Sequence, residues 1–194
     1  MIFSSIKKTV LQIPVEIRQF FKRAIIIFIA WNLLYNLVLF PSRVPDRQLT
    51  NITARITAFL YHTFVDNKTQ VSFKETINEG QVFTTVYLDN IPAVSIADPC
   101  NALGLYVLYI SILFCFSAPL KRKIIYSAAG CAIIFIANGL RCFGLTWMYI
   151  RKVPWFSFAH HYLFLVFIYA VIFFMWVSFI KKLKPTAAKR SEKK

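Results

Sequence analysis

Three side chains that are uncommon inside membranes stand at the ends of three successive hydrophobic segments: Cys100, Arg141 and His160. A thiol is a nucleophile, an imidazole moves protons, and a guanidinium stabilises an oxyanion, so together they suit acyl transfer through a covalent intermediate. Cys100 opens one segment, Arg141 lies near the far end of the next, and His160 opens the last. Because successive membrane spans run in opposite directions, we expect these side chains to meet at one membrane interface.

The composition is that of an integral membrane protein. Of the 194 residues, 58% are hydrophobic and 20 are phenylalanine, which is not typical of a soluble domain. A helix needs about 20 largely apolar residues to cross a bilayer. The predicted fold class is therefore an all-α integral membrane protein, one membrane-embedded domain over residues 1–194. It has about four transmembrane helices, at Ala24–Phe40, Cys100–Ala118, Ile124–Trp147 and His160–Ile180.

The basic residues predict the orientation of these spans. The net charge is +15, but the charges cluster beside the spans rather than on one soluble domain, so we expect no nucleic-acid partner. Fifteen basic residues fall in the N-terminal arm, the turn after the second span and the tail, against seven on the opposite side. The positive-inside rule then puts both termini in the cytoplasm. Residues 185–194 are predicted to be a disordered basic tail.

A small extracytoplasmic insertion is predicted between the first two spans, over residues 41–97. Apolar residues at helical spacing predict an amphipathic helix along the outer membrane surface, namely Ile52, Ile56, Phe59, Leu60 and Phe64. Gln70–Glu75 and Gln81–Leu88 alternate like strands around a turn at Asn78-Glu79-Gly80, which predicts a β-hairpin. Pro92 and Pro99 are then expected to lead the chain to the second span.

The surroundings of Cys100 and His160 indicate how each would react. Asp98 suits an N-cap and Pro99 the first helical position, so Cys100 is expected in a first helical turn, which favours a thiolate. His160 is expected at a helix N-terminus as a neutral base. The alternatives are a small residue packed at a helix start and an interfacial histidine. His161 competes with His160, since neighbours diverge by about 100° around a helix.

Arg141 is the residue hardest to explain by structure alone. It lies roughly 27 Å along the third span from Ile124, within the outer leaflet or its interface. An arginine there is costly unless it faces protein or snorkels to lipid phosphate, which is the alternative interpretation. Asn138 shares its helix face. We count Asn138, Asn101 and His161 as supporting residues of the predicted site.

The remaining cysteines predict neither a disulfide framework nor a metal centre. Cys115 and Cys131 lie deep within predicted spans and are interpreted as packing residues. Cys142 follows Arg141 but points about 100° away around the helix. Because no pair has C-x-x-C spacing, we expect no metal and no cofactor.

The order of these motifs resembles the exosortase/archaeosortase family. The likeness covers roughly Asp98 to Ile180. The short length of the chain and the forms of its motifs look most like the compact exosortases of Bacteroidetes. The matching blocks are Pro99-Cys100-Asn101-Ala102-Leu103-Gly104, Ile136-Ala137-Asn138-Gly139-Leu140-Arg141 and His160-His161-Tyr162-Leu163-Phe164. Most of that family has more than four spans.

The resemblance implies a cysteine protease/transpeptidase of the bacterial inner membrane, with its active site on the outer face. Its partners would be membrane lipid and exported proteins that end in a sorting signal of short motif, transmembrane helix and basic tail. Cys100 would be the nucleophile, Arg141 the stabiliser and His160 the acid and base. The acceptor is left open between water, a surface glycan and a lipid amine.

Two other functions compete with this hypothesis. A non-catalytic assembly or transport subunit would use Arg141 as a site for an anion or a lipid headgroup, and would not need Cys100. A thiol oxidoreductase would need a second cysteine near Cys100, and Cys142 is the only candidate.

Overall fold

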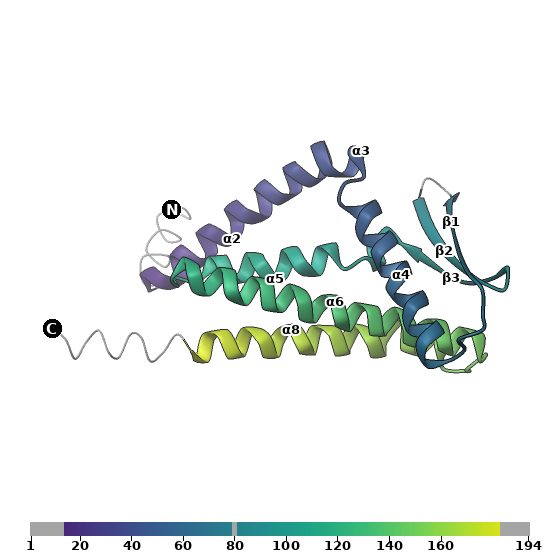
Figure 1. Cartoon of the computed structure of the whole chain (residues 1–194). Coiled ribbons are helices and arrows are strands. Elements are labelled where there is room, and N and C mark those ends of the chain that lie inside the picture. Colours follow the sequence, from purple (N-terminus) through teal and green to yellow (C-terminus); the bar gives the residue numbers. More distant parts are fainter. Residues whose placement is uncertain (1–13, 79–80, 183–194) are drawn as a thin grey trace.

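The computed structural model describes residues 14–78 and 81–182. The predicted disordered tail at 185–194, residues 1–13 and two residues of the predicted hairpin turn lie outside this range. The described chain is mostly helical, with a small antiparallel sheet at one end of a helical bundle (Figure 1).

Within the described residues, three helical segments are long and apolar enough to cross a membrane. The first combines α2 (Val15–Leu34), the π-helical turn η1 (Tyr35–Leu39) and α3 (Phe40–Ser42). The second is α6 (Leu120–Ile150). The third combines α7 (Phe156–Phe158), the π-helical turn η3 (Ala159–Leu163) and α8 (Phe164–Lys181). These segments agree with three of the four predicted spans.

The second predicted span is shorter than expected. Its helix, α5, covers only Leu103–Cys115, and at about 1.5 Å per residue this is less than the hydrocarbon thickness of a bilayer. Ala102 adopts a left-handed conformation with φ of 66°, which interrupts the helix before Leu103. At the other end, Phe116 is extended ahead of Pro119. The helix count from the sequence is therefore firm for three spans, with α5 as a shorter apolar helix.

Helices α5, α6 and α8 pack side by side, whereas α2 leans away from them (Figure 1). Gly130 of α6 lets the ring of Tyr109 approach closely, because a Cβ at this position would lie 2.0 Å from the ring. By contrast, no residue of α2 is buried. Its early part is held to α5 by Arg23, which donates hydrogen bonds to the Cys115 carbonyl and to Ser117.

Basic side chains gather at the end of the bundle away from the sheet. There Arg23 contacts the end of α5, Lys123 donates to the Phe114 carbonyl, and Arg122 donates to the Lys182 carbonyl. The start of α2 and the end of α8 lie at this same end (Figure 1). The bundle thus has a basic end, and the sheet lies at the opposite end (Figure 1).

The other end carries α4 (Asp46–Phe64) and the strands β1 (Val71–Asn78), β2 (Gln81–Leu88) and β3 (Ile91–Ala97). The strands form an antiparallel sheet in the order β1-β2-β3. The predicted hairpin is present as β1 and β2. The expectation that Pro92 only leads the chain to the next span is wrong, because Ile91–Ala97 forms a third strand that includes this proline. An edge strand tolerates proline, because the N–H groups on its outer side have no partner strand and the missing N–H of proline therefore breaks no hydrogen bond of the sheet.

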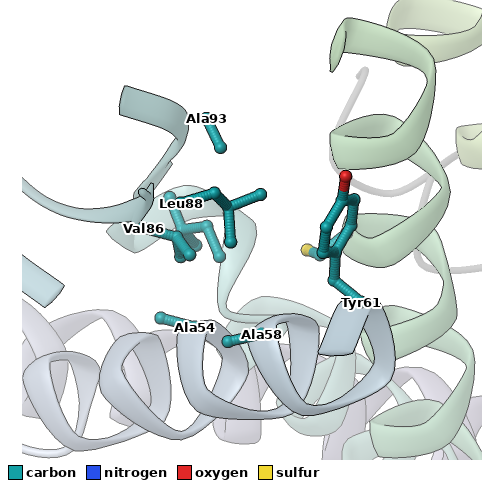
Figure 2. Packing of buried hydrophobic residues seen from close by; sticks show 8 residues of the cluster. Ala54, Ala58, Tyr61, Val86, Leu88 and Ala93 are labelled. Atoms are coloured by element: carbon teal, nitrogen blue, oxygen red, sulfur yellow. The ribbon is translucent and has the colours of Figure 1, made fainter. Parts of the chain in front are cut away.

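Helix α4 joins the sheet to the bundle through a face of small residues. Ala54, Ala58 and Tyr61 of α4 lie opposite Val86, Leu88 and Ala93 of the sheet (Figure 2). The predicted apolar stripe of α4 is only partly used in packing. Ile56 approaches α6 at Gly139, where a Cβ would lie 2.9 Å from it, but Phe59 and Phe64 stay exposed. Helix α4 thus packs across the bundle rather than resting on lipid alone.

Candidate active site

One cavity of about 350 Å³ brings together residues from four parts of the chain. Its walls include Cys100, Arg141 and His160, together with the strand residues Pro92–Ile96 and the α6 residues Cys142, Leu145 and Tyr149. The three residues singled out in the sequence therefore line the same space. This arrangement arises because β3 ends at Ala97 and leads directly into the turn that contains Cys100, while α6 and η3 approach from the bundle.

Cys100 lies in a short 3₁₀ turn, η2 (Asp98–Cys100), rather than in the first turn of a membrane span. The predicted N-cap role of Asp98 is wrong. Its carboxylate instead accepts hydrogen bonds from Arg43, at 2.6 Å, and from the Thr50 hydroxyl, at 2.8 Å. Because α5 begins only at Leu103, the expected help from the dipole of that helix does not apply to this thiol.

Asn101 fixes the turn that carries Cys100. It is 2% exposed, and its Oδ1 accepts a hydrogen bond of 2.8 Å from the Leu103 N–H at the start of α5. Its amide nitrogen donates to the Asp46 carboxylate at 2.8 Å, and Asp46 is itself 5% exposed. The Tyr35 hydroxyl donates to the same carboxylate at 3.1 Å. A buried carboxylate requires such donors, so this contact ties the Cys100 turn to α4 and to the first span.

Asn138 and Arg141 lie three residues apart on one face of α6. Asn138 is 2% exposed and donates to the Cys100 carbonyl at 2.9 Å. Arg141 lines the cavity, and its Nε is buried with no hydrogen-bond partner in the described part of the chain. The ion pairs there are Arg43–Asp98 and Arg47–Glu75, and Arg141 takes part in neither. Its guanidinium therefore faces the cavity as an unneutralised donor.

The π-helical turn η3 separates the two adjacent histidines. His160 lines the cavity, and its ring stacks on Phe156 with 6.0 Å between centroids and 2° between planes. His161 is exposed, and its Nδ1 lies 2.8 Å from the Ser157 carbonyl. The geometry thus directs His160 to the site and His161 away from it. Turns of this kind are frequent at functional sites because they re-aim a side chain.

Cys142 also lines the cavity, although only 5% of it is exposed. It packs in the core cluster that Cys100 borders. Both cysteines are free thiols, as are Cys115 and Cys131. The wall of the cavity thus contains two thiols, of which Cys100 is the less buried.

Sequence reasoning missed the polar residues that hold the Cys100 turn, namely Arg43, Asp46 and Thr50. It also missed the wall contributed by β3. Asp46 carried one usable signal, because it is one of only eight acidic residues in the chain and directly follows the first span.

Comparison with known proteins identifies a related family. The family model for transmembrane exosortases matches residues 18–177, which is most of the chain. No curated protein matches in a search of such proteins, and no solved structure matches either.

We predict that Asn101→Ala weakens the protein and loosens the turn. The change leaves the Leu103 N–H unpaired and removes a donor from the Asp46 carboxylate, which should lower the free energy of unfolding by about 1–3 kcal/mol. Thermal unfolding in detergent measures the loss, and alkylation of Cys100 by a maleimide should become faster. Asn67→Ala is the control, because Asn67 is exposed beyond α4. Unchanged stability and alkylation in Asn101→Ala would contradict the anchoring role.

Proposed function

We propose that this chain, which belongs to the transmembrane exosortase family, is a membrane-embedded cysteine peptidase or transpeptidase. Its substrates would be exported proteins that end in a short motif, a transmembrane helix and a basic tail. The observation that carries the proposal is the single cavity lined by Cys100, Arg141 and His160. A nucleophile, a proton carrier and an oxyanion stabiliser in one cavity satisfy the roles of thiol acyl transfer.

The proposed reaction has two acyl transfers. The Cys100 sulfur attacks a backbone carbonyl carbon while His160 takes the thiol proton. The carbonyl oxygen becomes an oxyanion, which the free guanidinium of Arg141 stabilises. Collapse breaks the C–N bond, the leaving amine takes the proton from His160, and a thioester remains on Cys100. Water or an amine of a surface glycan or lipid then attacks the thioester and regenerates the thiol.

Supporting residues hold this arrangement without reacting themselves. Asn138 fixes the Cys100 carbonyl and Asn101 fixes the turn. Reacting groups must lie within a narrow range of geometries for efficient attack, so we assign both residues to positioning.

Two observations favour other functions. The unpaired guanidinium of Arg141 suits a non-catalytic site for an anion or lipid headgroup. The presence of Cys100 and Cys142 in one cavity wall suits thiol redox chemistry. The first function needs neither cysteine, the second needs both, and the peptidase needs Cys100 alone.

We further propose that the cavity opens on the outer face of a bacterial inner membrane. The basic end of the bundle carries Arg23, Arg122 and Lys123, and basic flanks stay in the cytoplasm. The sheet and α4 lie at the opposite end (Figure 1). Both termini would then be cytoplasmic.

The two cysteine variants separate the three functions. Cys100→Ala should abolish processing of a co-expressed, tagged protein that ends in motif, helix and basic tail, because no other group supplies the thioester. Cys142→Ala should keep processing, and immunoblots of the tagged protein follow both. Normal processing by Cys100→Ala would exclude thiol catalysis, and loss of function in both variants would favour redox chemistry.

The adjacent histidines provide a second matched pair. His160→Ala should slow processing by at least about 100-fold, since this is the usual contribution of general acid–base catalysis. His161→Ala should process at close to the wild-type rate, because its ring lies outside the cavity. The initial rate of processing in isolated membranes measures both. Equal losses in the two variants would contradict the assignment of His160.

Cysteine labelling tests the orientation. In a chain with its four cysteines replaced by alanine, Lys68→Cys should react with a membrane-impermeant maleimide in intact cells. Lys121→Cys should react only after permeabilisation, because Lys121 lies in the first turn of α6, at the basic end of the bundle. The reverse pattern would put the cavity in the cytoplasm and exclude exported substrates.

A further inference from the structure

The outer edge of β3 is a free hydrogen-bonding edge. In the sheet order β1-β2-β3, this strand pairs only with β2. Across residues 14–78 and 81–182, no backbone hydrogen bond from a helix or loop reaches β3. An edge strand presents a row of N–H and C=O groups that another extended chain can pair with.

The same edge strand forms one wall of the cavity. Pro92–Ile96 line it opposite Arg141 and His160. The strand ends at Ala97 and passes directly into the turn that contains Cys100. A chain paired along β3 would therefore run past the thiol, since only three residues lie between Ile96 and Cys100 and a strand rises only about 3.3 Å per residue.

Strand β3 is fixed firmly enough to act as a template. Ala93 and Ile96 are 5% and 3% exposed and belong to the core cluster shared with α4. The register with β2 shifts between Val86 and Tyr87, so Ala93 forms a bulge. Bulges occur at edges and beside active sites, where they re-aim a strand. Pro92 has no N–H, so pairing would use the segment from Val94 to Ala97.

We propose that the substrate binds as an added β-strand on the outer edge of β3, with its scissile carbonyl carried to Cys100. This inference rests on the proposed peptidase function and specifies how that substrate is recognised. The occupant is a peptide in extended conformation, because alternating N–H and C=O groups match a backbone and not a lipid or a glycan. It is the stretch just before the transmembrane helix of the substrate.

The cavity also restricts the side chains of this peptide. Its volume is about 350 Å³, near the lower limit of ligand pockets, and Leu145, Cys142 and Tyr149 supply part of its wall. Side chains that point inward from the added strand are therefore small or apolar. Their neighbours point out of the cavity and are free to vary, since side chains alternate along a strand.

Photo-crosslinking tests the location of the peptide. In a Cys100→Ala chain, which keeps the substrate intact, Ser95→p-benzoylphenylalanine places a crosslinker on β3 in the cavity wall. Ser72→p-benzoylphenylalanine is the matched control, because Ser72 is also an exposed serine on an edge strand, the opposite one. The probe is the tagged membrane protein used above.

Ser95 should crosslink to residues just before the transmembrane helix of the tagged protein, and Ser72 should not. Mass spectrometry locates the linked residues. A crosslink between two copies of this chain through Ser95 would identify the edge as a dimer contact instead. Absence of a substrate crosslink at Ser95, or equal crosslinks at both serines, would also overturn strand addition.

A proline scan of the substrate tests the hydrogen bonds directly. Proline removes one N–H, so processing by the wild-type chain should fall by about tenfold or more at alternate positions before the helix. Alanine at the same positions should leave processing largely unchanged where the side chain points outward. Uniform tolerance of proline, or uniform loss, would exclude pairing. If Cys100→Ala still processes the substrate, the peptidase function itself fails. If only the scan and the crosslinks fail, the peptidase stands and strand addition is wrong.

Discussion

The buried contact between Asn101 and Asp46 is the constraint on which the site depends. A carboxylate that is 5% exposed must be matched by donors, and the Asn101 amide is one of them. The same side chain accepts the first free N–H of α5. One asparagine therefore fixes the start of α5, the position of α4 and the turn that contains Cys100. The segment formed by α4 and the sheet is thus part of the site and not a separate cap.

Arg141, unlike Asp46, carries a charge that has no partner in the described structure. Its guanidinium has no carboxylate partner among the described residues, although a buried charge without a partner is costly. A purely structural arginine would be expected to pair with the acidic groups nearby, yet Asp98 pairs with Arg43 and Asp46 binds Asn101. Such local conflicts with stability are typical of functional sites. The unmet charge is the feature that a reacting carbonyl or an anion would satisfy.

Much of the fold was predictable because the bilayer imposes simple requirements. Length and hydropathy identified three spans, and their alternation brought Cys100, Arg141 and His160 to one end. The break after Cys100 was not predictable, since Ala102 is left-handed although it is not glycine, and the neighbouring Asn101 bonds to Asp46, 55 residues away. Strand β3 was missed because Pro92 argued against a strand, and only its edge position makes that proline acceptable. The choice between the two histidines required the π-helical turn.

The position of the sheet at the end of the bundle also indicates which part of a membrane-anchored substrate the proposed peptidase could cut. Within a helix, each backbone carbonyl accepts a hydrogen bond from an N–H of the same helix. In lipid no water is present to replace that N–H as a donor, so the carbonyl stays hydrogen-bonded. In the proposed reaction, attack by Cys100 would require that carbonyl to be free, so the substrate would have to be extended where it is cut. The outer edge of β3 offers replacement hydrogen bonds at the end of the bundle, beside the thiol. For the proposed peptidase, this requirement would place the cut at the membrane boundary rather than within the span.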